Sequence, residues 1–199
     1  MPTVISHSIV GMGIAQWPRF VKGRRLLFAS IILAALPDTD TILMGIFGHD
    51  SIFRHRGILH SVFFAIVSAG ITVWLFRHKQ WISHDAVWKL FAVLFLIAFS
   101  HPLLDGYSTG GYIGVAYLAP FDNTRYVLGD LLPLAPLGPA KLLSERGISL
   151  FLAEAGMLWT FAIGSYYWNR VSTDRSRFRT IAACFWLFEM ILWVHAGLA

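Results

Sequence analysis

Histidine and aspartate recur in short motifs along the first half of the chain. They occur at His7, in Leu36-Pro37-Asp38-Thr39-Asp40, in His55-Arg56-Gly57-Ile58-Leu59-His60-Ser61 and in His101-Pro102-Leu103-Leu104-Asp105. Imidazole and carboxylate groups are ligands of zinc and other borderline divalent ions, and a catalytic ion keeps one position open for water. These residue types therefore predict a divalent-metal site that activates water for hydrolysis.

The spacing of the acidic residues fits such a site. His101 and Asp105 stand four residues apart, so both can chelate one ion if their helix continues past Pro102. Asp38 and Asp40 stand two apart, a spacing that separates them on a helix but lets both point inward from a turn. One of these two aspartates can bridge two ions or accept a proton from the attacking water, with the other as a ligand.

The motif between the two aspartate motifs adds basic groups. His55 and His60 stand five apart with Gly57 between them, which is typical of a loop that enters a helix. Arg56 is the only cation within this polar cluster, and its planar guanidinium suits a phosphate or carboxylate group. We expect Arg56, His55 and Arg125, which lies on a later loop, to bind an anionic substrate.

Each motif also has a structural interpretation. His7 can be a packing residue on an apolar face, and Asp38 and Asp40 can cap a helix. His55 and Arg56 can contact lipid head groups at the membrane boundary. The metal-site interpretation is the more economical one, because it explains all the motifs together.

The composition indicates the surroundings in which these residues act. Of 199 residues, 56% are hydrophobic and 14% are charged, and the mean hydropathy is +0.62. These values exclude a disordered chain and favour an integral membrane protein with one domain over residues 1–199. The 16 Lys and Arg form no stripe of the kind that binds nucleic acid, and the single cysteine, Cys184, leaves no intrachain disulfide.

Apolar runs predict an all-α, polytopic transmembrane bundle with five or six membrane segments and a long extracytoplasmic loop. Pro37 is expected to end or kink the second segment, and the chain from there to Ile58 is expected to be irregular. The first segment is the weakest and can be re-entrant. The expected segments cover residues 3–17, 26–47, 61–76, 87–104, 148–168 and 180–198, and the loop covers residues 106–147.

The distribution of positive charge predicts the orientation. If all six segments cross, eleven of the sixteen Lys and Arg fall on one side and five on the other. The side with eleven should be cytoplasmic, which places both termini outside. All the metal-type residues then lie near the outer boundary, so the site is expected to face the extracytoplasmic side of a bacterial or archaeal cytoplasmic membrane.

Across residues 3–126, the sequence resembles the YdjM-like family of membrane-bound, metal-dependent hydrolases. The resemblance rests on the ordered set of motifs Ser6-His7, Leu36-Pro37-Asp38-Thr39-Asp40, His55 to Ser61, Ser100-His101-Pro102-Leu103-Leu104-Asp105, and Thr109-Gly110-Gly111 followed by Pro120-Phe121. The family is in turn distantly similar to zinc-dependent phospholipase C and P1-type nucleases. That link implies phosphoester hydrolysis by analogy, with His7, one Asp of the 38/40 pair, His60, His101 and Asp105 as ligands.

The sequence thus predicts a membrane-bound hydrolase that uses a divalent metal, zinc first and manganese second. Its substrate is expected to be a lipid or lipid-linked molecule with a phosphoester or related bond. Two alternatives stay open: a metal-ion or proton transporter that uses the same residues as a transient ion site, and a regulatory membrane protein whose metal only joins helices.

Overall fold

The computed structural model describes residues 2–18, 21, 23–108, 114–129, 131–132 and 143–169, with a few isolated positions from 180 to 191. Within these ranges the protein is helical, and its only β interaction is an isolated antiparallel bridge between Val115 and Tyr126. Most of the predicted segment 180–198, much of the loop 106–147 and the Thr109-Gly110-Gly111 motif lie outside the described residues.

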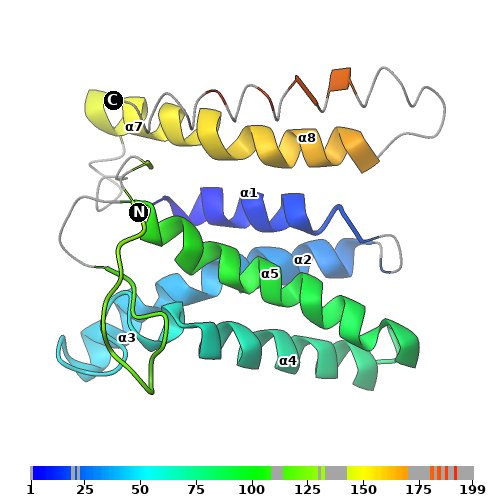
Figure 1. Ribbon diagram of the computed structural model, residues 1–199, viewed down its shortest axis with the longest axis horizontal. Helices are drawn as coiled ribbons and strands as arrows, with labels where there is room; N and C mark the ends of the chain where they lie inside the picture. The colour runs from blue at the N-terminus through cyan, green and yellow to red at the C-terminus, as the bar shows by residue number, and fades with distance from the viewer. Residues whose placement is uncertain are drawn as a thin grey trace.

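The helices run along one common direction (Figure 1). The helix pair α7 and α8 lies along α1, while α5, α2 and α4 form the rest of the bundle. Their bounds are α1 Val4–Ile14, α2 Arg24–Ala35, α3 Asp40–Phe47, α4 Val62–His78, α5 Val87–Gly106, α7 Glu145–Glu154 and α8 Thr160–Asn169, with a π-helical turn at Ala155–Trp159 between the last two. The start of α1, the end of α5 and the α2–α3 junction meet at one end of the bundle.

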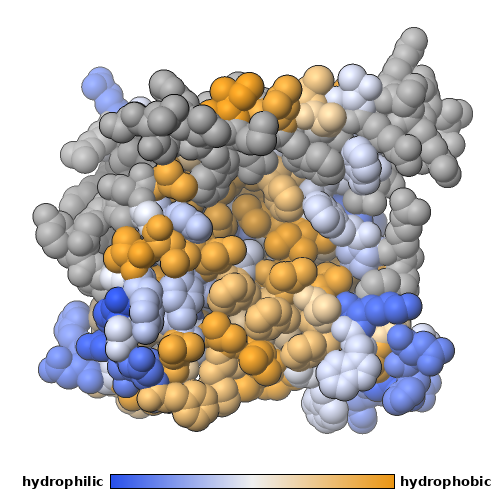
Figure 2. Space-filling model, in the orientation of Figure 1, coloured by the Kyte–Doolittle hydropathy of each residue, from blue (hydrophilic) through white to orange (hydrophobic). Residues whose placement is uncertain are grey.

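Three continuous helical stretches are long and apolar enough to cross a membrane: Arg24–Phe47, His84–Gly106 and Gly147–Trp168. The apolar helices α1 and α4 are shorter, at 11 and 17 residues. Figure 2 shows hydrophobic residues over the middle of the described surface and hydrophilic residues toward its two ends, as expected for a protein surrounded by lipid. The all-helical membrane fold is confirmed, and the count of five or six spans stays a prediction.

Two prolines shape the helices near the motifs. Helix α2 ends at Ala35, as expected from Pro37, and a 3-10 turn at Leu36–Thr39 follows it. The prediction of an irregular chain up to Ile58 is wrong for Asp40–Phe47, which form α3. Pro37 stands in the first turn of the new helical stretch, where its missing N–H leaves no hydrogen bond unmade. Helix α5 continues through Pro102 to Gly106, as the metal-site interpretation requires.

A glycine allows α1 to approach α2 closely. A Cβ atom on Gly11 would lie 2.7 Å from the Cβ of Ala34 and 3.0 Å from the carbonyl oxygen of Ser30. Small residues at such crossings let helix backbones pack in the absence of a hydrophobic driving force in lipid. Gly11 therefore fixes the position of α1, which carries His7 one turn earlier.

We predict that Gly11→Leu destabilises the protein by roughly 1–3 kcal/mol, because the new side chain forces α1 and α2 apart. Thermal unfolding in detergent measures this loss. Gly70→Leu on α4 is the matched control, since no other atom lies within 4 Å of a Cβ at that position. An equal change in melting temperature for both variants would show that Gly11 has no special packing role.

Candidate metal centre

Four separate segments bring imidazole and carboxylate groups together at one end of the bundle. His7 comes from α1, Asp38 from the 3-10 turn after α2, and His60 from the 3-10 turn before α4. His101 and Asp105 come from the last turns of α5. All five are buried, and the three histidines have no exposed surface. Ionisable groups are costly in such an interior, so their clustering calls for a shared partner.

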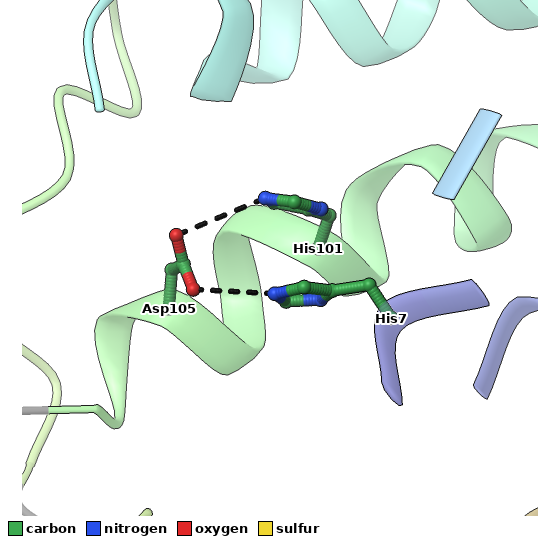
Figure 3. A group of neighbouring side chains, drawn as sticks. All are labelled: His7, His101 and Asp105. Atoms are coloured by element: carbon green, nitrogen blue, oxygen red, sulfur yellow. Dashed lines mark ion pairs between the residues drawn. The ribbon is translucent and has the colours of Figure 1, made fainter. Parts of the chain in front are cut away.

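Asp105 lies between the three histidines. Its Oδ1 is 3.4 Å from His7 Nε2, and its Oδ2 is 3.2 Å from His60 Nε2 and 3.8 Å from His101 Nε2. Figure 3 shows His7 and His101 side by side, both facing the carboxylate of Asp105. The rings of His7 and His101 are stacked, with centroids 3.6 Å apart. His101 also approaches Asp38, with 3.5 Å between Nε2 and Oδ1.

These atoms form two overlapping groups of possible metal ligands. One consists of His7, His101 and Asp105, and the other of Asp38, His60 and His101. In each group the ligand atoms lie within 4.8 Å of one another. His101 belongs to both groups, so the cluster offers either one ion position with alternative ligands or two adjacent positions.

The hydrogen bonding of the cluster tests whether a cation fits it. Both ring nitrogens of His7 and both carboxylate oxygens of Asp38 and of Asp105 are buried without a partner in hydrogen-bond geometry. The Nε2 atoms of His60 and His101 face each other at 3.1 Å. Buried polar atoms without partners are destabilising, and a divalent cation would provide a partner for one nitrogen of His7 and for the carboxylates of Asp38 and Asp105. The residues present therefore fit a divalent metal.

The orientation of His101 suits a ligand. Its Nδ1 lies 2.6 Å from the carbonyl oxygen of Ala34, an acceptor only, so Nδ1 carries the proton and donates it. The lone pair is then on Nε2, which faces the cluster. A second partner of this kind fixes the tautomer and ring orientation of metal-binding histidines.

Asp40 occupies a different position from Asp38. Its Oδ2 accepts the backbone N–H of Arg56 at 2.9 Å and lies 3.1 Å from His60 Nδ1, while its Oδ1 lies 3.0 Å from His55 Nδ1. It thus contacts His60 on the ring nitrogen that points away from the cluster. This geometry favours a role in which Asp40 orients His60. The prediction that Asp40 itself binds metal or accepts a proton stays untested by the geometry.

His60 has an environment with two opposing effects. Burial favours the neutral ring and lowers its pKa, but contacts with the carboxylates of Asp105 and Asp40 outweigh burial and raise the pKa to about 9. In the absence of a cation, the ring is therefore protonated and partly neutralises the carboxylates. A metal ion at the cluster would compete with that proton for Nε2, so metal binding would release it.

The two arginines expected to bind substrate lie at different distances from the cluster. Arg56 is buried, with its Nε 3.5 Å from Asp105 Oδ2 and an Nη2–H donated to Ser108 Oγ at 2.8 Å. Arg125 donates to the backbone carbonyl oxygens of Gly114 and His55, at 3.0 and 3.1 Å. Arg56 thus stands directly beside the possible ligands, whereas Arg125 joins the segment 114–129 to the loop that carries Arg56.

Glu154 and Ser108 are residues that sequence reasoning left outside the site. The buried Glu154 carboxylate accepts the backbone N–H and, at 2.9 Å, the hydroxyl of Thr3, the residue that caps α1. It therefore holds α1 one turn before His7. An acidic residue within an apolar segment was the available signal for Glu154. Ser108 had none, because its hydroxyl meets Arg56 only in the fold.

Comparison with known proteins identifies the family of membrane proteins to which the chain is similar. The model of the family described as YdjM inner membrane protein matches residues 1–193. Inner membrane protein YbcI of Escherichia coli (strain K12) is 34% identical over 182 residues, which cover 85% of this chain and 99% of that protein. No solved structure matches the chain. With three apolar helices long enough to span a bilayer, these matches make the chain an integral membrane protein, and it belongs to the YdjM family of inner membrane proteins.

Proposed function

We propose that this protein is a membrane-bound, metal-dependent hydrolase that cleaves a phosphoester or related bond in a lipid or lipid-linked substrate. The observation that carries the proposal is a group of buried nitrogen and oxygen atoms around Asp105 that could bind a metal. They have no hydrogen-bond partner and lie beside the Arg56 guanidinium. A cation that only joined the helices would need these ligand atoms, but it would not need a buried arginine beside them. A cation at the cluster would add positive charge, and Arg56 would extend that charge toward an anionic substrate.

The residues that would hold the cation are His7, Asp38, His60, His101 and Asp105. When bound, the cation supplies Lewis-acid activation of water and of the phosphoryl group. The mixed nitrogen and oxygen donors suit zinc first and manganese second.

The chain's own residues divide the remaining tasks. Arg56 would orient the anionic group of the substrate, with Ser108 holding its guanidinium. Asp38 would bind the cation through one carboxylate oxygen and accept the proton on the other, because both its oxygens lack hydrogen bonds and it is 8% exposed. Asp40 is the poorer proton acceptor, because it faces three nitrogen atoms and is fully buried. His55 and Arg125 would support the loop on which Arg56 stands.

The position of the cluster supports a substrate from the bilayer. It lies at one end of the bundle, where α1 begins and α5 ends, so the head group of a lipid can meet it without leaving the membrane. The excess of positive charge at the other boundary assigns the cluster to the extracytoplasmic side in this proposal.

The burial pattern favours hydrolysis over ion transport. Among the described residues, the buried charged side chains are Asp38, Asp40, Arg56, Asp105 and Glu154. All of them lie at the end of the bundle where α1 begins. A transporter of ions needs charged or ionisable groups that continue toward the opposite boundary, and the described residues provide no buried charged side chain there.

Turnover by purified protein tests the proposal. Detergent-purified protein is washed with chelator, reloaded with zinc or manganese, and assayed against a panel of phospholipids and lipid phosphates, with His60→Ala/Asp105→Ala as the comparison. We expect metal-dependent product release that the double variant lacks. Equal release by the double variant would refute the proposed site, and stoichiometric metal without turnover of any substrate would favour the structural role.

A further inference from the structure

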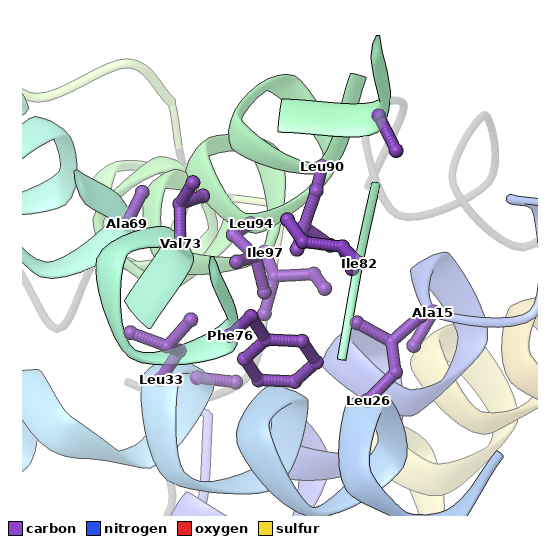
Figure 4. Close-up of a cluster of buried hydrophobic side chains, with 12 residues drawn as sticks. Ala15, Leu26, Leu33, Ala69, Val73, Phe76, Ile82, Leu90, Leu94 and Ile97 are labelled. Atoms are coloured by element: carbon purple, nitrogen blue, oxygen red, sulfur yellow. The ribbon is translucent and has the colours of Figure 1, made fainter. Parts of the chain in front are cut away.

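An apolar groove runs between α2 and α4, separate from the metal centre. Its volume is about 710 Å³. It is lined by side chains of α2 and the turn after it, from Arg24 to Leu36, and of α4 and its C-cap, from Phe64 to Lys79. Leu33 and Phe76, labelled in Figure 4, belong both to its wall and to the buried core, so a packed surface backs the groove. Its volume lies in the range of ordinary ligand sites.

Between its basic end and its other end, the wall of the groove offers no free hydrogen-bonding group to a ligand. Two hydroxyl residues line it, but Thr72 Oγ1 donates to the carbonyl of Ser68 at 2.8 Å, and Ser68 Oγ donates to that of Ala65 at 3.2 Å. Both hydroxyls are thus satisfied within α4. The groove therefore suits a ligand that is apolar over most of its length.

One end of the groove is strongly basic. Arg24, Arg25 and Lys79 line it there, and no Asp or Glu belongs to the lining. Among the described residues, none of these three cations forms an ion pair with a carboxylate, and Arg25 lies over the ring of Trp81 at 4.3 Å. This end is opposite the metal centre, because α2 starts at Arg24 and reaches the cluster only after Ala35.

The length of the groove matches one leaflet. The stretch from Arg24 to Leu36 measures roughly 18 Å at 1.5 Å per residue, slightly more than half of a hydrocarbon core about 30 Å thick. A phospholipid with an anionic head group matches the groove, because its head group would lie at the basic end and its acyl chain would run along the apolar wall toward the middle of the membrane.

We propose that the groove is a binding site for one anionic phospholipid. Its phosphate contacts Arg24, Arg25 and Lys79, and one acyl chain lies between α2 and α4. The site is independent of the proposed hydrolase activity, since none of the possible metal ligands lines it.

Native mass spectrometry of delipidated protein in detergent tests this site. The protein is titrated with phosphatidylglycerol and with phosphatidylethanolamine of identical acyl chains. We expect one phosphatidylglycerol per chain to bind at least tenfold more tightly than phosphatidylethanolamine. Equal affinity for the two lipids would overturn the proposal.

Two variants separate the head-group end from the chain. Arg24→Gln/Lys79→Gln is expected to weaken phosphatidylglycerol binding about 25-fold, from about fivefold for each cation. Arg77→Gln/Lys89→Gln is the matched control, because both side chains are exposed near the same boundary but neither lines the groove. An equal loss in the control would show nonspecific attraction and overturn the proposal.

Thr72→Phe fills the groove and is expected to weaken the same binding, whereas Leu96→Phe on the exposed face of α5 should not. The lipid site would be overturned if the lipid-free protein were a dimer that Thr72→Phe dissociates while lipid affinity stays unchanged. That result would assign the groove to a second copy of the chain.

Discussion

Replacing Asp105 by asparagine is expected to weaken zinc binding by at least about a hundredfold, beyond the effect typical of residues that only support a metal ligand. The Asp105 carboxylate lies within 3.4 Å of His7 and of His60, and both its oxygens are buried without hydrogen bonds. An amide at this position loses the charge and turns N–H donors toward the cluster. Chelator-washed protein reloaded with zinc and analysed for metal content gives the stoichiometry, and competition with a chromophoric chelator gives the affinity.

Asp122→Asn is the matched control for this substitution. Asp122 is an exposed carboxylate on the segment 114–129, and among the described residues it accepts hydrogen bonds from the backbone and side chain of Thr124. These bonds lower the pKa of its carboxyl group, so Asp122 is charged at neutral pH. Equal zinc affinity in wild type, Asp122→Asn and Asp105→Asn would remove Asp105 from the metal site. Circular dichroism of each variant confirms that the helices are intact.

The helical part of the fold was largely predictable from the chain. Apolar runs identify membrane helices because lipid offers backbone groups no alternative partner, and Pro37 gave the end of α2 within one residue. Prediction failed after Pro37, because a proline at the start of a helical stretch begins a helix as readily as it ends the previous one. The number of crossings could not be derived, since α1, with 11 residues, is too short to span a bilayer unaided.

The sequence was sufficient to predict which residues gather at the site, but it was less informative about where each of them lies within the site. The four-residue spacing of His101 and Asp105 placed them on one helix face, as α5 shows. The two aspartates of the Asp38-Thr39-Asp40 motif could not be told apart, because only the fold shows one facing His101 and the other the outer side of His60. The contacts of Glu154 with the start of α1 join residues 151 positions apart, which no local pattern reports.

The difference between Asp38 and Asp40 leads to a second large effect. Asp38→Asn is expected to behave as the loss of a ligand, with zinc binding weakened about a hundredfold or more. Asp40→Asn is expected to weaken binding by roughly 10–100-fold, as for residues that orient a metal-binding histidine. Both carboxylates are buried, and both substitutions preserve shape, so their unequal effects would report the two positions rather than a general loss of packing.

Cobalt substitution distinguishes a ligand from a positioning residue, because visible absorption of the bound ion follows the atoms that coordinate it. Asp40→Asn protein, saturated with cobalt, is expected to show the wild-type spectrum at reduced affinity, since His60 still reaches the cluster through Nε2. Asp38→Asn should change the spectrum itself, because an oxygen ligand is replaced. A changed spectrum in Asp40→Asn and an unchanged one in Asp38→Asn would reverse the assignment, making Asp40 the ligand and leaving Asp38 at the edge of the site.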